Sequence, residues 1–155
     1  MTNLATLYDT DYSTWAQRNA ELLRARRFEE LDIEHLLEEL SDMGKSDRRE
    51  LESRLLILLA HLLKWEYHYH NLAERWREFE GRSWRSTIME QRQRLAILLR
   101  KSPGLKSILN EAVAQAYSDA LELASDETGL PRSTFPPDCP YSIEHLLDKT
   151  YFPAA

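Results

Sequence analysis

At 155 residues the chain has the length of one ordinary domain, which can bury a core without a disulfide or a structural metal. Its 26 acidic residues against 20 basic ones give a formal net charge of −6, and this argues against a nucleic-acid-binding protein, which needs a basic face for phosphates. The single cysteine, Cys139, excludes an internal disulfide and favours the reducing cytoplasm, and the N-terminus shows no secretion signal.

Helix signals begin after a short N-terminal stretch. Residues 1–10 are expected to be a loosely held arm, and Asp11 can cap a helix over residues 12–26. Asp32 then caps a second helix, which has one apolar stripe. That stripe consists of Ile33, Leu36, Leu37, Leu40 and Met43.

Gly44 allows two interpretations of the segment around it. The second helix can end there, with Ser46 or Asp47 opening a third helix. Alternatively, one helix runs through Gly44, since the eleven residues from Leu40 to Leu51 nearly conserve helical phase. We expect a break or kink, because a continuous helix would place Asp47 in the apolar stripe.

The stretch from Leu51 to Trp65, LESRLLILLAHLLKW, is the part around which the rest of the chain is organised. Between Leu55 and Leu63 only His61 is not apolar, so we expect a central helix that is buried on most of its circumference. This run of nine residues is too short to cross a bilayer, which takes about 20 residues.

Two helices are predicted after the central one. Asn71 with Glu74 resembles a capping box for a short helix, which Gly81 would stop. Ser83 then caps a longer helix over residues 84–101.

The last third of the chain contains one long helix and an irregular end. The long helix is expected from Pro103 to about residues 125–126, because proline is tolerated at the first helical position and Gly129 provides a stop. Residues 130–155 are expected to form a Pro-rich loop and a tail packed on the bundle. Within them, Ser142 caps a short terminal helix.

Together these segments predict an all-α fold. It is a helical bundle of four or five main helices around the central apolar helix. We expect a single helical domain over residues 1–155, since no repeat or low-complexity tract divides the chain.

Several stretches of the chain, in this order, resemble family 29 of the domains of unknown function, a bacterial group common in cyanobacteria and proteobacteria. They are YDTDYSTWA (8–16), LDIEHLLEEL (31–40), RRELESRLLILLAHLLKW (48–65), SWRSTIMEQR (83–92), SPGL (102–105), ETGLP (127–131) and FPPDCPYS (135–142). The resemblance implies an all-helical fold and no established activity. Residues 66–82 are longer than the connection that family members have there and lack its Gln-Pro, so we interpret them as a variable inserted segment.

Four basic residues of the central helix share one stripe, because they are separated by 7, 3 and 4 residues. They are Arg54, His61, Lys64 and His68. Cationic groups that face a core need acceptors. The candidates are Glu34, Glu38, Glu39, Gln91 and Glu127. We interpret the set as a hydrogen-bond and ion-pair network that fixes helix register, and the alternative is a polar site in which His61 acts as an acid–base or ligand-contacting group.

The five histidines make only a weak case for a metal site. The chain has neither the two Glu-x-x-His motifs of ferritin-like sites nor the HExxH zinc motif. Lys64, between His61 and His68, would repel a cation. The weak candidates, drawn from different helices, are His35, His61 and His145. We therefore expect no metal and no cofactor.

Without a complete catalytic or metal motif, the sequence favours a non-catalytic protein-interaction or regulatory module in the cytoplasm. The expected partner is another protein, with a homo-oligomer as one option, and neither nucleic acid nor a membrane is expected. The alternative is a small hydrolase or ligand-binding protein that uses His61 with Glu38 or Glu39, with or without a divalent metal. The residues of that candidate polar network are His61, Lys64, Glu38, Glu39, Arg54 and Gln91.

Overall fold

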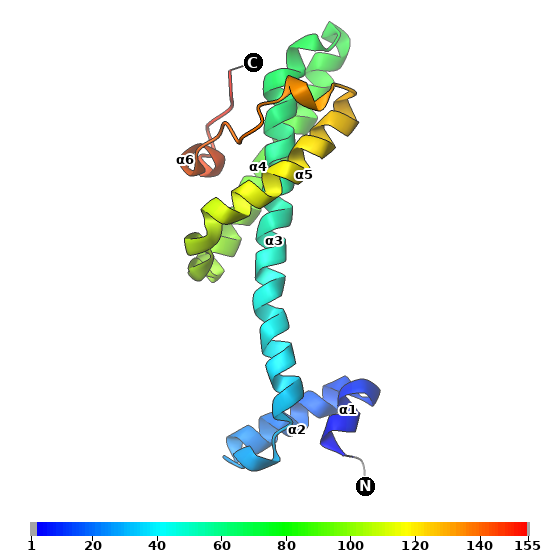
Figure 1. The fold of residues 1–155 in the computed structure, drawn as a ribbon, viewed down its shortest axis with the longest axis vertical. Coiled ribbons are helices and arrows are strands. Elements are labelled where there is room, and N and C mark those ends of the chain that lie inside the picture. Colours follow the sequence, from blue (N-terminus) through cyan, green and yellow to red (C-terminus); the bar gives the residue numbers. More distant parts are fainter. Residues whose placement is uncertain (1–2, 155) are drawn as a thin grey trace. The chain divides into compact units, whose positions relative to one another are not determined.

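The computed structural model describes residues 3–154, except the side chain of Arg75. These residues contain six α-helices, four short 3₁₀ helices and no strand, which confirms the predicted all-α fold (Figure 1). Within the same residues, no helix is both long and apolar enough to span a membrane. The chain divides into two compact units, one up to Ser46 and one from Asp47 onwards. Helix α3 begins in the first unit and ends in the second. That residues 1–155 form a single domain therefore stays a prediction.

The first unit begins with two helices. Helix α1 spans Leu4–Thr10 and helix α2 spans Tyr12–Arg24. The Oδ1 atom of Asp11 accepts a hydrogen bond from the backbone N–H of Thr14 at 3.2 Å, so the predicted cap is confirmed. The prediction of a loosely held arm is wrong for residues 4–10, which form α1. The Asn3 side chain caps α1, and Leu7 is buried. Residues 1–2 of that predicted arm lie outside the described residues.

Helix α3 runs without interruption over the 35 residues Ile33–Tyr67 (Figure 1). The break expected at Gly44 is therefore wrong. A glycine inside a helix costs only about 1 kcal/mol relative to alanine, which a helix of this length can accept. Asp47, the reason for expecting a break, accepts a hydrogen bond from the Ser102 hydroxyl at 2.8 Å. The Ser102 hydroxyl thus provides Asp47 with a polar partner, and the helix continues without a break.

The core of the second unit lies along the later half of α3, as the sequence predicted. Its buried residues on that helix are Leu51, Leu55, Leu58, Leu59, Ala60, Leu62 and Leu63. Helix α4, Glu74–Lys101, and helix α5, Leu109–Thr128, contribute the apolar residues that pack against them. The predicted central helix is thus confirmed, and it ends at Tyr67, just before the 3₁₀ helix Tyr69–Asn71.

Helix α4 continues through Gly81, so the predicted stop there is wrong, and so is the separate helix capped by Ser83. The predicted capping box is also wrong, because Ala73 is the N-cap and offers no side-chain cap. A Cβ atom at position 81 would lie 2.7 Å from Cε2 of Tyr69. Gly81 therefore serves a close approach inside a helix, and it is not a terminator.

The C-terminal part follows the predicted order with one change. Residues Pro103–Ile108 form a 3₁₀ helix, and α5 begins only at Leu109. Gly129 ends α5 with a φ of 74°, as expected for a left-handed cap. Helix α6 spans Ile143–Leu147, and the Ser142 hydroxyl accepts the hydrogen bond of its predicted cap. The loop before α6 contains the 3₁₀ helix Arg132–Thr134, and its residues Phe135 and Tyr141 are buried against the core.

Candidate functional site

Lys64 is a buried cation in the second unit. Its side chain is 6% exposed, and its ammonium group pairs with the carboxylate of Glu127 near the end of α5. The same Nζ atom lies 5.3 Å from the ring centre of Trp84 on α4, a distance that suits a cation–π contact. The prediction that Lys64 meets an acid is confirmed. The pair joins α3 to α5, as a structural network would.

His61, one turn before Lys64, is half-buried on the same helix. Its Nδ1 atom lies 2.8 Å from the carbonyl oxygen of Ile57 and donates to it. Burial lowers the pKa of His61, and the nearby charge of Lys64 lowers it further. The ring is therefore neutral near pH 7, with Nε2 as its acceptor. These contacts suit a residue of the packed bundle.

Arg54 and Gln91 are brought together, as the predicted network required. The Arg54 guanidinium donates to Oε1 of Gln91 at 3.5 Å, and it lies 3.8 Å from the Glu50 carboxylate. His68 lies near Trp84, with 6.2 Å between the ring centres. Its buried Nδ1 atom has no hydrogen-bond partner within the described part of the chain. Of the four basic residues that share this stripe, Arg54 and Lys64 thus have acceptors, which are Gln91 on α4 and Glu127 on α5.

Glu38 and Glu39 belong to the first unit and have other contacts. The carboxylate of Glu39 accepts hydrogen bonds from the hydroxyls of Tyr8 and Tyr12, the latter at 2.7 Å. Glu38 is exposed. Glu39 belongs to the first unit, whereas His61 belongs to the second. The six predicted network residues therefore form separate groups.

The three candidate metal ligands have separate contacts as well. His35 bonds the Asp32 carboxylate at 2.6 Å and stacks on Tyr8, with 4.0 Å between ring centres. His145 stacks on Tyr151 at the same centre-to-centre distance. Among the described residues, no three His, Cys, Asp or Glu side chains are grouped so that they could hold a metal ion.

Arg92 has a role that was not predicted from the sequence. This arginine is 1% exposed, and its three guanidinium nitrogens donate to the backbone carbonyls of His145, Leu146 and Tyr151 at 2.7–3.0 Å. It therefore ties the C-terminal segment to α4. One signal could have found it, because positions 88, 92, 95 and 99 have the spacing of an inward helical stripe, and the other three are apolar.

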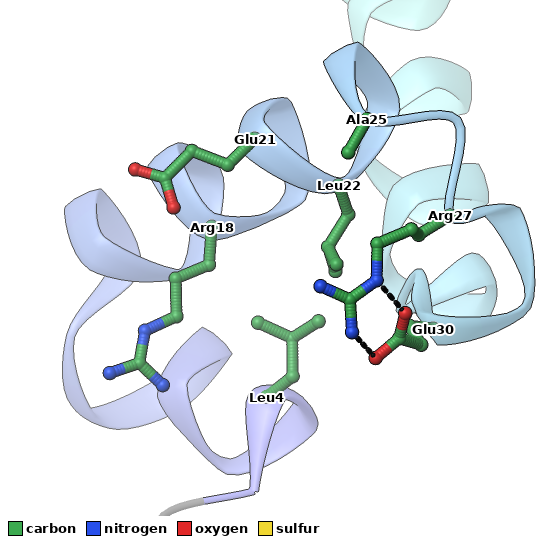
Figure 2. A pocket seen from close by; sticks show the side chains of 7 residues that line it. All are labelled: Leu4, Arg18, Glu21, Leu22, Ala25, Arg27 and Glu30. Carbon is green, nitrogen blue, oxygen red and sulfur yellow. Dashed lines mark hydrogen bonds and ion pairs between the residues drawn. The ribbon is translucent and has the colours of Figure 1, made fainter.

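A hollow of about 560 Å³ lies in the first unit (Figure 2). Its lining residues are Leu4, Arg18, Glu21, Leu22, Ala25, Arg27 and Glu30. Figure 2 shows Leu22 pointing towards Leu4, with the ion pair of Arg27 and Glu30 beside them. Two arginines and two glutamates give this lining no net charge. The lining therefore gives no net electrostatic preference for an anion or a cation.

The most unusual surface of the first unit is on α3. Four large apolar side chains there are exposed to water: Ile33 by 50%, Leu37 by 59%, Leu40 by 63% and Met43 by 65%. We call these four residues the α3 stripe. The sequence predicted them on one face, together with Leu36, which is partly buried. Such a contiguous set of exposed apolar side chains is typical of an interaction surface.

The family model described as "Domain of unknown function DUF29" matches residues 7–152. The chain belongs to this family. The resemblance noted from the sequence is thus confirmed over nearly the whole chain. No curated protein and no solved structure matches this chain. Because membership of DUF29 assigns no activity, the function must be inferred from the contacts and exposure of this chain's own residues.

Proposed function

We propose that this DUF29 chain is a non-catalytic interaction module of the cytoplasm, and that the α3 stripe binds a helix of another protein chain. The observation that carries the proposal is the exposure of Ile33, Leu37, Leu40 and Met43, each by half or more. An amphipathic helix is the natural occupant of such a stripe, because its own apolar face repeats at the same spacing. Because each of these side chains is already partly covered, burying the rest of it would contribute about 1–2 kcal/mol.

The small core of the first unit supports the same proposal. Among its described residues, the buried apolar side chains are Leu7 and Trp15. Further exposed apolar residues of this unit are Tyr12, Leu23 and Phe28. A segment of fewer than 50 residues with so little buried apolar area gains little stability from its own core. A bound helix would supply the missing burial, so binding and ordering of this unit would reinforce each other.

The alternative, a hydrolase or ligand-binding site at His61, has less support. A site that uses His61 with Glu38 or Glu39 needs those carboxylates next to the imidazole, whereas Glu39 is engaged by two tyrosines. Lys64 has its acid in Glu127. The contacts of His61 and Lys64 support a network that sets helix register, which is the role that the spacing favoured from the start.

Site-specific photocrosslinking in living cells would test the proposed role. A benzoylphenylalanine in place of Leu40 should crosslink to a protein, either a second copy or a different chain. The matched control carries it in place of Glu122, an exposed residue of α5. Crosslinks at position 40 and none at position 122 support an interface on α3. No protein crosslink at position 40, or equal yields at both positions, would reject the proposed function.

A further inference from the structure

We propose that the occupant of the α3 stripe is the same stripe of a second copy, with the two helices antiparallel. This inference rests on the proposed function and names its partner. Three properties of residues 33–45 favour this pairing: the apolar spacing, the open glycine within that spacing, and the placement of opposite charges on one side of it.

The apolar spacing is self-complementary when the helix is reversed. Ile33, Leu37, Leu40 and Gly44 are separated by 4, 3 and 4 residues, which is the heptad spacing of a coiled-coil seam. In an antiparallel pair centred between Leu37 and Leu40, each Leu37 packs on the partner's Leu40. The same register sets Ile33 against the partner's Gly44, so the four seam positions of each chain meet four seam positions of the other.

Gly44 suits its place in this seam. A Cβ atom there would have no heavy atom within 4 Å, so the surface beside it is open. Lacking a side chain, Gly44 leaves room for the branched Ile33 of the partner, and the two backbones can approach closely at that point. Gly44 lowers the stability of an isolated helix, but at a helix–helix contact it allows close packing.

The charges beside the seam select the antiparallel direction. Glu34 and Lys45 are eleven residues apart and hence on the same side of α3. Both are exposed, and neither forms an ion pair within residues 3–154. In the proposed register Glu34 faces the partner's Lys45, and the two-fold axis produces this pair twice. A parallel pair would instead set Glu34 against Glu34 and Lys45 against Lys45.

The opposite side of the seam is apolar. Leu36 and Met43 lie there, and Met43 is 65% exposed. The antiparallel register brings Leu36 of one copy near Met43 of the other. One alignment therefore satisfies the seam, the charged side and the apolar side together, and this agreement favours a second copy over an unrelated helix.

Sedimentation velocity over a range of concentrations tests the proposal. The unaltered chain should self-associate, and Leu40→Asp should weaken the association by about a hundredfold, because each dimer buries two copies of Leu40. Glu34→Lys and Lys45→Glu should each weaken it by about tenfold, since each replaces two attractive pairs with repulsive ones. Glu122→Lys and Lys149→Glu, which make the same charge changes at exposed positions elsewhere, should have no effect.

A mixture of the two charge variants is the decisive arm. Glu34→Lys chains mixed with Lys45→Glu chains should associate with each other as tightly as the unaltered chain does with itself, because every facing pair is again opposite in charge. A monomer at all concentrations, a dimer insensitive to Leu40→Asp, or a mixture no tighter than its components would each overturn the proposal.

Carbodiimide crosslinking of a mixture of ¹⁵N-labelled and unlabelled chains reports the direction of pairing. A zero-length bond between Lys45 of one copy and Glu34 of the other is expected. Within one chain these residues are about 16 Å apart along the helix, too far for such a bond. Crosslinks at position 40 to a different protein only, together with a monomeric chain, would overturn the second copy as occupant and leave the interaction module standing.

Discussion

The ring of Tyr69 occupies the space that a side chain on Gly81 would need, since a Cβ atom there would lie 2.7 Å from Cε2. The same ring stacks on Trp65, with 4.7 Å between the ring centres. Gly81→Ala should therefore fail to stabilise the protein, although alanine normally gains about 1 kcal/mol over glycine inside a helix. The ring must move, and its stacking, worth about 0.5–1.5 kcal/mol, is weakened. Urea unfolding would measure the change.

Two controls make this prediction specific. Gly44→Ala, at a helix position with open space, should gain about 1 kcal/mol when measured at concentrations where the chain is monomeric. In a Tyr69→Ala background, Gly81→Ala should regain its helix-forming benefit of about 1 kcal/mol. Equal gains from Gly81→Ala with and without the tyrosine would show that the ring does not matter.

Replacement of Arg92 by methionine should destabilise the protein by about 3 kcal/mol, because three backbone carbonyls lose a buried charged donor. Arg94→Met is the matched control. Its guanidinium is half-exposed and pairs with Glu90 on the same helix, so the expected loss is below about 0.5 kcal/mol. Unfolding by urea separates the two outcomes. Similar small losses for both variants would contradict the anchoring role of Arg92.

The Lys64–Glu127 pair should show an asymmetric mutational pattern. Glu127→Gln leaves a buried ammonium without its charged partner, so we expect a loss of about 2 kcal/mol. Lys64→Met combined with Glu127→Gln should be nearly neutral, since a methionine fills similar volume beside Trp84 without needing an acid. A double-mutant cycle from unfolding free energies gives the coupling. Additive losses would mean that the two side chains do not interact.

His35 should titrate above its value in the unfolded chain. Its hydrogen bond to Asp32 raises its pKa, while burial opposes the rise. The bond therefore stabilises the first unit fully below about pH 6.5 and is lost as pH rises through the raised pKa. NMR titration of the His35 ring, against the same signal in urea, checks the direction. Asp32→Asn should remove most of the rise, since the charges of Glu38 and Asp9 contribute less, and an unchanged His35 titration in that variant would contradict this cause.

His61 should show the opposite direction on the same helix. Burial lowers its pKa, so the unfolded chain binds a proton first as pH falls. Stability should decrease from about pH 6.5 downwards, through the lowered pKa. His61→Gln should remove that part of the pH dependence of the unfolding free energy. A variant with the same acid slope as the unaltered chain would contradict the prediction.

The features predicted correctly are those that depend on neighbours in sequence. Asp11 and Ser142 cap their helices with their own side chains, and Gly129 ends α5 with its left-handed backbone. The apolar run of Leu55–Leu63 also had only one plausible environment. Each of these features is decided within a few residues, so a single sequence contains the necessary information.

The features predicted wrongly depend on contacts that are distant in sequence. The sequence alone does not distinguish Gly44 from Gly81. Both lie inside helices, and of the two only Gly81 has an aromatic ring next to the position that a Cβ atom would take. The role of Arg92 depends on the carbonyls of His145, Leu146 and Tyr151, which are more than 50 residues away in the sequence. Glu39 was expected to face the basic stripe, yet its partners are Tyr8 and Tyr12. A glycine costs a helix only about 1 kcal/mol, so tertiary packing decides whether the helix continues through it.

Seven consecutive residues of α3, from Leu40 to Ser46, are exposed to water. Two turns of helix are thus maintained by backbone hydrogen bonds alone, with a glycine among them, and helices that lack packing are marginal in water. In a lone chain, trypsin should therefore cut after Lys45, in addition to cutting at the exposed arginines of the turn before α3. A chain whose α3 is covered should resist the cut after Lys45, so the rate of that single cut reports occupancy of the helix.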